Sequence, residues 1–367
     1  MTSGTVSRSE ATASRAGAWR SPLPSVLVAP DVEGTPVPDE RPPTGPLHAG
    51  HMISSYRIDR LLGMGGMGWV YRARHEVTAR RVALKILRED QLAYDRSIDR
   101  MMREASILAS VSHPGIPRFF ECGVLDDGRP WIAMELLDGV ALTERMRRPL
   151  DADTVIELVA WVAEVLAAAH TRGVTHRDLK PDNVILVPGD ARFPVRVIDW
   201  GIAHFPAGMR FTNMNEALGT PTYMAPEQAR GDGTGGHSDV YGLGVVAYEA
   251  LTGRPPFQGA TSVDILAKHL NRPVPALAPR CPEAPYGLVE LVERMLAKSI
   301  DERPSAAEVC SRLARLRTAR QAPRGALPDD DAVPVPVLEL EASVTPLPRV
   351  PTARSVWSGR TESGTDE

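Results

Sequence analysis

Cysteine is scarce in this sequence. The 367 residues include three cysteines, Cys122, Cys281 and Cys310, which lie far apart and form no Cys-x-x-Cys pair. The spacing therefore indicates neither a disulfide framework nor a zinc site. Sparse cysteine of this kind is typical of a reducing compartment, and we expect a cytoplasmic protein.

A basic excess and a long apolar run are missing as well. Lys and Arg number 42 against 46 Asp and Glu, so the formal net charge of -4 does not favour a nucleic-acid partner. The most apolar helix candidate, residues 155–170, contains Glu157 and Glu164. A membrane-spanning helix needs about 20 predominantly apolar residues, and the N-terminus carries no apolar signal segment. We therefore expect no membrane insertion.

Proline is plentiful, and its distribution divides the chain. Many of the 33 prolines lie in two end segments that mix Ser, Thr and charged residues with little periodicity. We expect a disordered tail over residues 1–52 and a second, Pro-rich one over 319–367. Between them, residues 53–318 are long enough to form one large domain or two coupled lobes with a hydrophobic core.

Two kinds of hydrophobic periodicity occur within this expected domain. Residues 56–87 and 118–137 alternate like strands, with a helical pattern over 95–111 between them. Farther along the chain the periodicity becomes mainly helical. We therefore expect an α+β fold, with a small β-rich N-lobe of about 53–137 that carries one helix and a larger, mainly helical C-lobe of about 138–318.

A glycine-rich run, Gly63–Val70, interrupts the first strand pattern. Glycine has no Cβ and lets backbone N–H groups approach a polyphosphate closely, so the run is a candidate phosphate-binding turn. A glycine-rich hairpin without a ligand would have the same pattern. A dinucleotide-binding fold is disfavoured, because it needs a helix directly after the glycines, whereas WVYRARH continues as a strand.

Lys85 lies between apolar neighbours in VALKIL. A buried ammonium group costs several kcal/mol unless an anion meets it, so we expect a carboxylate or a phosphate beside it. Glu104, on the helical pattern, is the candidate carboxylate. The alternative is that Lys85 extends its amine to solvent and Glu104 is simply solvated.

The stretch THRDLKPDNVIL, residues 175–186, crowds charged and amide side chains between two apolar segments. With the glycine-rich run, VALK, VIDWG and MAPE it resembles the protein kinase signature. The resemblance covers about residues 54–316, and GMGGMGWVY, HRDLKPDN and GTPTYMAPE resemble the eukaryotic-type (Hanks-type) serine/threonine kinases of bacteria. It implies a bilobal protein-kinase-like fold that transfers the γ-phosphate of ATP to Ser or Thr hydroxyls of proteins.

The resemblance also implies roles for individual residues. Asp178 would accept or orient the hydroxyl proton of the substrate, and Lys180 would lie beside the γ-phosphate. Lys85 would contact the α- and β-phosphates, with Glu104 fixing its position. Together these four residues would form the catalytic set.

A metal site and a nucleotide pocket are implied in the same way. Asn183 and Asp199 would hold Mg²⁺, with Mn²⁺ as an alternative, since oxygen ligands suit this hard cation. The residues that would surround ATP, including the backbone of the hinge, are Leu62, Gly63, Met64, Gly65, Gly66, Met67, Gly68, Val70, Ala83, Lys85, Met134, Glu135, Leu137 and Ile185.

Two aromatic positions near these motifs need separate treatment. We expect His176 to be a packed core residue, stacked in a column with Leu108, Phe119 and Trp200, and not a catalyst. Trp200 stands where the family more commonly has Phe. Its larger ring carries an N–H that needs a partner when buried, so it would shift the equilibrium between the in and out conformations of the Asp199–Gly201 (DWG) motif.

The segment from Asp199 to Glu227 resembles an activation loop. Arg177 precedes the catalytic Asp178, an arrangement that in the family accompanies control by loop phosphorylation, because Arg pairs well with phosphate. Thr212 is the candidate phosphosite, and the alternative is that it is an ordinary polar loop residue. Thr220 is the candidate substrate-pocket threonine that would bond Asp178 and Lys180.

The substrate class is inferred from the motifs that follow. GTPTYMAPE resembles the wall that receives a peptide, Glu227 would pair with Arg303, and Asp239 would hold the backbone of the catalytic loop. A nucleotide-binding pseudokinase scaffold and a small-molecule kinase are the alternatives. The first is favoured only by Trp200, and the second is disfavoured by MAPE. A homodimer that phosphorylates itself in trans is a further possible assembly.

The replacement Thr212→Ala tests the phosphosite. If phosphate on Thr212 orders the loop through Arg177, the variant has lower phosphoryl-transfer activity than the wild type. The measurement is turnover of both proteins as purified and after complete dephosphorylation. Equal turnover of the fully dephosphorylated wild type and of the phosphorylated form would contradict it.

Overall fold

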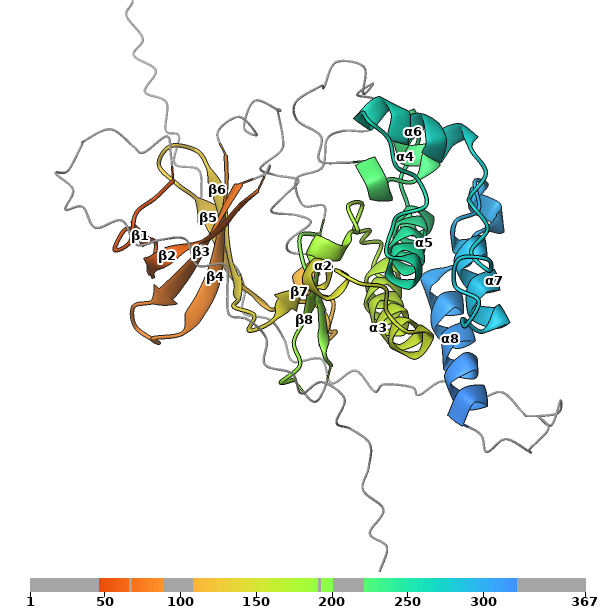
Figure 1. Ribbon diagram of the computed structural model, residues 1–367. Coiled ribbons are helices and arrows are strands. Elements are labelled where there is room, and N and C mark those ends of the chain that lie inside the picture. Colours follow the sequence, from red (N-terminus) through yellow and green to blue (C-terminus); the bar gives the residue numbers. More distant parts are fainter. Residues whose placement is uncertain (1–45, 66–67, 89–107, 191–192, 201–220, 322–367) are drawn as a thin grey trace, which may run out of the picture. The chain divides into compact units, whose positions relative to one another are not determined.

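The computed structural model describes residues 46–65, 68–88, 108–190, 193–200 and 221–321 (Figure 1). Within these ranges the first part of the chain forms strands and the later part is mainly helical, as the periodicity predicts. The helix expected over 95–111 lies almost entirely outside the described residues.

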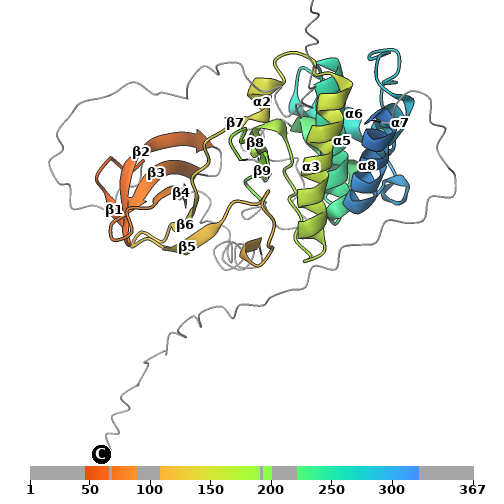
Figure 2. The same cartoon turned by 90° about the horizontal axis from the view of Figure 1, so that it is seen from below.

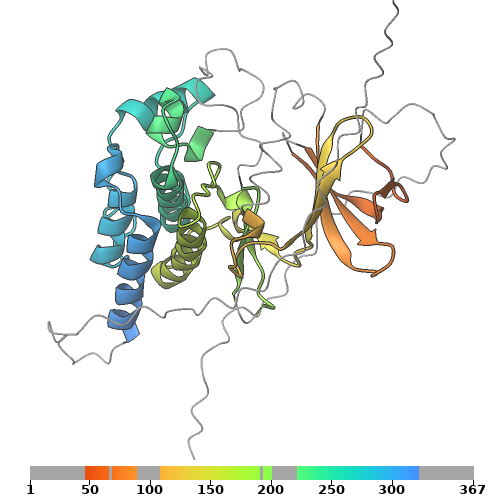
Figure 3. The same cartoon turned by 180° about the vertical axis from the view of Figure 1, so that it is seen from behind.

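The larger sheet contains six antiparallel strands in the order β1-β2-β3-β4-β6-β5. Figure 3 shows these strands from behind. Alternation of apolar side chains produces a core under the sheet in which Tyr71, Ala73 and Leu84 are fully buried. The strands are β1 (Met52–Ile53), β2 (Tyr56–Gly65), β3 (Gly68–His75), β4 (Arg81–Leu87), β5 (Phe119–Val124) and β6 (Pro130–Glu135).

A residue ahead of the expected domain start at residue 53 packs against the larger sheet. Leu47 is buried, and its backbone N–H donates to the Tyr71 hydroxyl at 2.8 Å. The last described helix continues to Gln321. A single leucine in a proline-rich segment carries no periodic signal, so sequence analysis did not single it out.

The second part of the chain is built on helices. Asp151 caps the N-terminus of α3, where its Oδ1 accepts from the Thr154 N–H at 2.8 Å. The described helices are α2 (Leu142–Arg145), α3 (Ala152–His170), α4 (Pro226–Arg230), α5 (Gly236–Thr252), α6 (Ser262–Asn271), α7 (Tyr286–Met295) and α8 (Ala306–Gln321).

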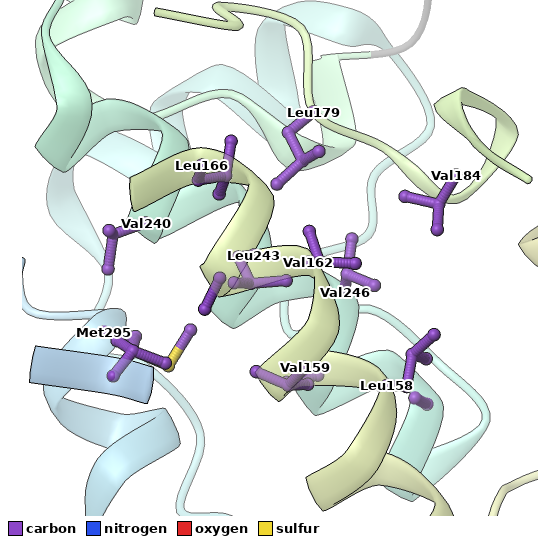
Figure 4. Packing of buried hydrophobic residues seen from close by; sticks show 14 of the residues in the cluster. Leu158, Val159, Val162, Leu166, Leu179, Val184, Val240, Leu243, Val246 and Met295 are labelled. Atoms are coloured by element: carbon purple, nitrogen blue, oxygen red, sulfur yellow. The ribbon is translucent and has the colours of Figure 1, made fainter. Parts of the chain in front are cut away.

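The helical core lies around α3 and α5. Helix α3 packs against both α5 and α8 (Figure 2). Figure 4 shows apolar side chains of α3, such as Val162 and Leu166, directed toward Leu243 of α5. All three are fully buried. This packing fixes α5, whose first turn contacts the loop that contains the HRDLKPDN motif.

A small sheet carries that loop. Strands β7 (Val140–Ala141), β8 (Val184–Leu186) and β9 (Val195–Val197) pair antiparallel in the order β7-β8-β9. The segment between α3 and β8 contains the HRDLKPDN motif and ends in a 3₁₀ turn, Pro181–Asn183. Both functional segments, 175–183 and 198–200, are therefore attached to adjacent strands.

A buried ion pair joins α4 to the segment before α8. Arg303 binds both carboxylate oxygens of Glu227, at 2.7 and 2.8 Å, and Ser238 donates to the same carboxylate at 2.7 Å. Burial alone would raise the pKa of Glu227, but Arg303 and Ser238 hold it below its usual value. The pairing of Glu227 with Arg303 expected from the sequence is confirmed.

Removing one partner of this pair tests its contribution to stability. Arg303→Met leaves the Glu227 carboxylate buried without its cation and is expected to lower the free energy of unfolding by about 3–5 kcal/mol. Urea denaturation at pH 7 measures the change. Arg230→Met, which removes an exposed pair with Asp232, is the matched control and should change stability by less than about 0.5 kcal/mol. Equal effects of the two variants would contradict the prediction.

Candidate active site

One carboxylate holds the backbone of the HRDLKPDN loop. Asp239, at the start of α5, is 2% exposed. Its Oδ2 accepts from the His176 N–H at 2.8 Å and its Oδ1 from the Arg177 N–H at 2.7 Å. Arg177 adopts φ of 67°, an uncommon conformation for a non-glycine residue, and these bonds hold it there. The expected role of Asp239 is confirmed.

Asp178 follows directly and lies among groups that restrain it. Its Oδ2 accepts from Lys180 Nζ at 2.6 Å. Asn183 Nδ2 donates to the Asp178 carbonyl at 2.8 Å and is 3.4 Å from Oδ2. The Asp178 side chain is 33% exposed, so its carboxylate is oriented by the loop and still open to solvent.

Lys85 of β4 meets the carboxylate of Asp199. The Nζ–Oδ1 distance is 2.7 Å, and the two side chains are 17% and 38% exposed. Desolvation would raise the pKa of Asp199, but the ammonium of Lys85 outweighs it and holds that pKa below its usual value. Lys85 therefore has the anionic partner that its apolar flanks require. Glu104, the partner expected from the sequence, lies outside the described residues.

Asp199 and Asn183 present oxygens suited to a divalent cation. Ile198 N–H donates to the Asn183 carbonyl at 2.9 Å, which holds the two segments together. Because Asn183 uses its Nδ2 group as a donor, its Oδ1 stays available as a ligand. Within the described ranges no group of three or more His, Cys, Asp and Glu is placed to hold a metal by itself. Two protein oxygens fit an ion such as Mg²⁺, which takes its other ligands from phosphates and water.

The residues expected around ATP come from both sheets. In the larger sheet Val70 pairs with Lys85, and Ala83 pairs with Met134, so these four are cross-strand neighbours. Ile185 belongs to β8. The remaining expected positions are Leu62, Gly63, Met64 and Gly65 on β2, Gly68 on β3, Glu135 at the end of β6 and Leu137 two residues later, while Gly66 and Met67 lie outside the described residues.

The N–H of Glu135, at the start of the expected hinge, is used within the larger sheet. It donates to the Arg118 carbonyl at 2.8 Å, and the Glu135 side chain accepts from the Arg118 N–H at 3.2 Å. The Glu135 N–H is therefore not available to a nucleotide in this structure.

The glycines of the run differ in what surrounds them. A Cβ added at Gly63 or Gly65 would have no atom within 4 Å, whereas one at Gly68 would lie 2.1 Å from the Ile86 carbonyl oxygen. Gly68 is thus required by the close approach of β3 to β4. Internal packing does not explain Gly63 and Gly65, whose open surroundings suit a ligand.

His176 and Trp200 pack as the sequence suggested. His176 is fully buried, and its ring centroid lies 5.0 Å from that of Trp200. Leu108 and Phe119 belong to the same core. Trp200 is 3% exposed, and its indole N–H donates to the Val197 carbonyl at 2.8 Å. The extra donor of the tryptophan is therefore satisfied inside the fold.

Sequence analysis did not single out Gln228. Its Nε2 donates to the Arg177 carbonyl at 2.7 Å, and its Oε1 accepts from the Ala225 N–H at 2.9 Å. It thus connects α4 to the catalytic loop. A glutamine that follows a motif residue has no periodic signature. Thr212 and Thr220 lie outside the described residues.

A family model for the protein kinase domain matches residues 56–313. The chain belongs to this family. Membership implies use of ATP and a divalent metal ion, and it accounts for the order of strands, loop and helices described above.

Individual bacterial protein kinases resemble the chain over the same region. The serine/threonine-protein kinase Pkn1 of Myxococcus xanthus is 40% identical over 256 residues, covering 69% of this chain and 37% of the relative. The serine/threonine-protein kinase PknF of Mycobacterium tuberculosis is 36% identical over 301 residues, covering 80% of this chain and 61% of the relative. The chain therefore spans between about a third and three-fifths of these curated relatives.

A solved kinase domain has the same fold. The crystal structure of the PknI kinase domain of Mycobacterium tuberculosis matches with a TM-score of 0.59 at 29% identity, covering 74% of this chain and 99% of that domain. The expected kinase fold, with a β-rich N-lobe and a helical C-lobe, is confirmed. None of the described helices has both the length and the apolar character to cross a bilayer.

Alanine at two glycines of the kinase domain separates packing from ligand binding. Gly65→Ala adds a methyl group that meets no other protein atom, so it should change the free energy of unfolding by less than about 0.5 kcal/mol. The same methyl group would occupy space in which a phosphate approaches the backbone, so the KM for ATP should rise. Gly68→Ala collides with the Ile86 backbone and should lower that free energy by about 1–3 kcal/mol. Steady-state kinetics and urea denaturation of both variants measure these effects. A destabilised Gly65→Ala with unchanged KM would contradict the assignment.

Proposed function

We propose that this domain is an ATP- and Mg²⁺-dependent serine/threonine protein kinase. The observation that carries the proposal is the joint placement of Asp178, Lys180 and Asn183 beside the Lys85–Asp199 pair. This arrangement combines one oriented base, two cations for phosphate charge and two oxygens for a metal. Phosphoryl transfer needs little else from the protein than such positioning and charge neutralisation.

In the proposed reaction the oxygen of a substrate hydroxyl attacks the γ-phosphorus of ATP. The bond between that phosphorus and the β–γ bridging oxygen breaks, and ADP leaves. Asp178 accepts the hydroxyl proton, Lys180 lies beside the γ-phosphate, and Lys85 contacts the α- and β-phosphates. Asn183 and Asp199 hold the divalent cation, Mg²⁺ with Mn²⁺ as an alternative. A bound cation supplies charge neutralisation to the phosphates.

The proposed substrates are Ser and Thr hydroxyls of proteins. The support is the Pro221–Tyr223 turn and α4, which follow the activation segment and are fixed by the Glu227–Arg303 pair. We further propose that the kinase works in the cytoplasm, that two copies autophosphorylate in trans on Thr212, and that Thr220 contributes to the substrate pocket. The catalytic domain would be residues 53–318.

Transfer of labelled γ-phosphate from Mg-ATP tests the function. Wild type should label itself and a generic basic protein on Ser or Thr. Asp178→Asn removes the proton acceptor and Lys85→Met removes the phosphate contact, so each should lower transfer by at least about 100-fold. Asp232→Asn, which alters an exposed aspartate that pairs with Arg230, is the control and should retain full activity.

The contrary outcomes point to different alternatives. A folded wild type that binds ATP and transfers no phosphate, even after treatment with a partner kinase, would indicate a nucleotide-binding scaffold. Transfer to small metabolites and to no protein would indicate a small-molecule kinase.

A further inference from the structure

Helix α6 ends in a buried aromatic cluster that the phosphoryl-transfer mechanism does not use. His269, near its C-terminus, is fully buried, and its Nδ1 is 2.9 Å from the Tyr241 hydroxyl. Phe257 contacts the same ring edge-on, at a centroid distance of 4.9 Å. The Nε2 atom of His269 has no hydrogen-bond partner among the described residues.

Lys298 closes this cluster with a positive charge. Its Nζ donates to the His269 carbonyl at 2.7 Å and lies 4.4 Å from the centre of the Phe257 ring and 5.9 Å from that of Tyr241. The carbonyl belongs to the last turn of α6, where a cation is favoured. In the described part of the chain no carboxylate lies within ion-pair distance of Lys298.

The charged groups around Lys298 make its protonated form costly. Arg303 lies beside it, and the nearby Glu227 carboxylate is bound by Arg303 on both oxygens. The other facing groups are Tyr241 and His269. Burial first, and then Arg303, lower the pKa of Lys298 to about 8. Burial and Lys298 likewise lower the pKa of His269 to about 4, so its imidazole is neutral near pH 7.

This cluster supports the turn that belongs to the proposed peptide wall. Helix α6 packs against Pro221–Tyr223 and against α4. Thr222 is 8% exposed, and its backbone is close enough to the His269 ring to oppose the fall in the pKa of that histidine. If Nδ1 accepts from the Tyr241 hydroxyl, the neutral ring carries its hydrogen on Nε2.

We propose that Lys298 is a positioning residue, which through His269 holds Pro221–Tyr223 in place and thereby sets the affinity for the protein substrate but not for ATP. The inference rests on the proposed kinase function and adds a determinant of its peptide site. Among the described residues no carboxylate offsets the partial desolvation of the Lys298 ammonium. Its hydrogen bond to the His269 carbonyl fixes the end of α6 at the point where this helix supports the wall.

Lys298→Met separates positioning from stability, because methionine has a similar shape and lacks the charge and the donor. The KM for a generic basic protein, or for a peptide made from its mapped phosphosite, should rise about fivefold, the change expected for one lost hydrogen bond. The KM for ATP should stay within about twofold. The melting temperature should be unchanged or higher, since the desolvated ammonium is removed.

Two further variants identify what the lysine supplies. Lys298→Gln keeps a donor for the His269 carbonyl without the charge and should recover part of the lost affinity. Lys268→Met is the matched control. It removes another lysine of α6, whose Nζ donates to the Gln258 carbonyl at 2.5 Å, and it should leave the KM for protein unchanged. An equal rise in both methionine variants would contradict a specific role for Lys298.

The pH dependence provides a second readout. In the wild type the KM for protein should rise as pH increases through about 8, because Lys298 loses its proton. In Lys298→Met this step should be absent. Stability should respond to pH in the opposite way to substrate affinity. Between pH of about 8 and 10.5 the unfolded chain keeps a proton on Lys298 that the folded chain has lost, so the contribution of Lys298 to the free energy of unfolding increases with pH.

Hydrogen exchange distinguishes failure of this inference from failure of the kinase function. Peptides that cover residues 221–224 should exchange faster in Lys298→Met than in the wild type, whether or not phosphate is transferred. A wild type without protein phosphorylation would overturn the proposed function alone. Unchanged exchange, or a KM for protein that matches the wild type at pH 7, would overturn the role of Lys298.

Discussion

The buried carboxylate of Asp239 is the constraint on which the functional loop depends. It accepts from the N–H groups of two successive residues, His176 and Arg177, one of which has a positive φ. A loop residue in that conformation persists only when the surrounding structure determines it. Helix α5 also contacts the loop at a second point. A Cβ added at Gly242, one turn after Asp239, would lie only 3.2 Å from the Leu179 carbonyl oxygen. The helix therefore lies directly against the loop that presents Asp178.

Charge within the site is arranged as pairs that a substrate could exchange for phosphate. Lys85 meets Asp199, and Lys180 meets Asp178, at 2.7 and 2.6 Å. All four side chains keep part of their surface exposed, from 17% to 38%. Such pairs cost less to rearrange than a fully buried pair, because solvent already screens them. By contrast, the Glu227–Arg303 pair is almost completely buried and has a structural role in the fold.

The sequence predicted the parts of the molecule that have a local or a motif signature. Strand alternation, the helical patterns after Asp138, and the contacts of Asp239 and of Glu227 with Arg303 agree with the structure. Features that depend on close approach of distant segments were not predictable. Gly68 belongs to the glycine-rich run, yet its requirement comes from the Ile86 backbone. Leu47, Gln228 and Lys298 likewise acquire their partners only when the chain folds, so no spacing in the sequence identifies them.

Two cations of the helical lobe, Arg303 and Lys298, contribute differently to stability. Both lie near the Tyr241 ring, and Arg303 is 3% exposed whereas Lys298 is only partly buried. Arg303 recovers the cost of its burial through two bonds to a carboxylate, so its loss is expected to weaken the fold. Among the described residues Lys298 meets the end of a helix and aromatic faces, which offset the cost of its desolvation in part. The helix that it contacts, α6, packs against the wall of the proposed substrate site, so the proposed role of Lys298 is to position that wall.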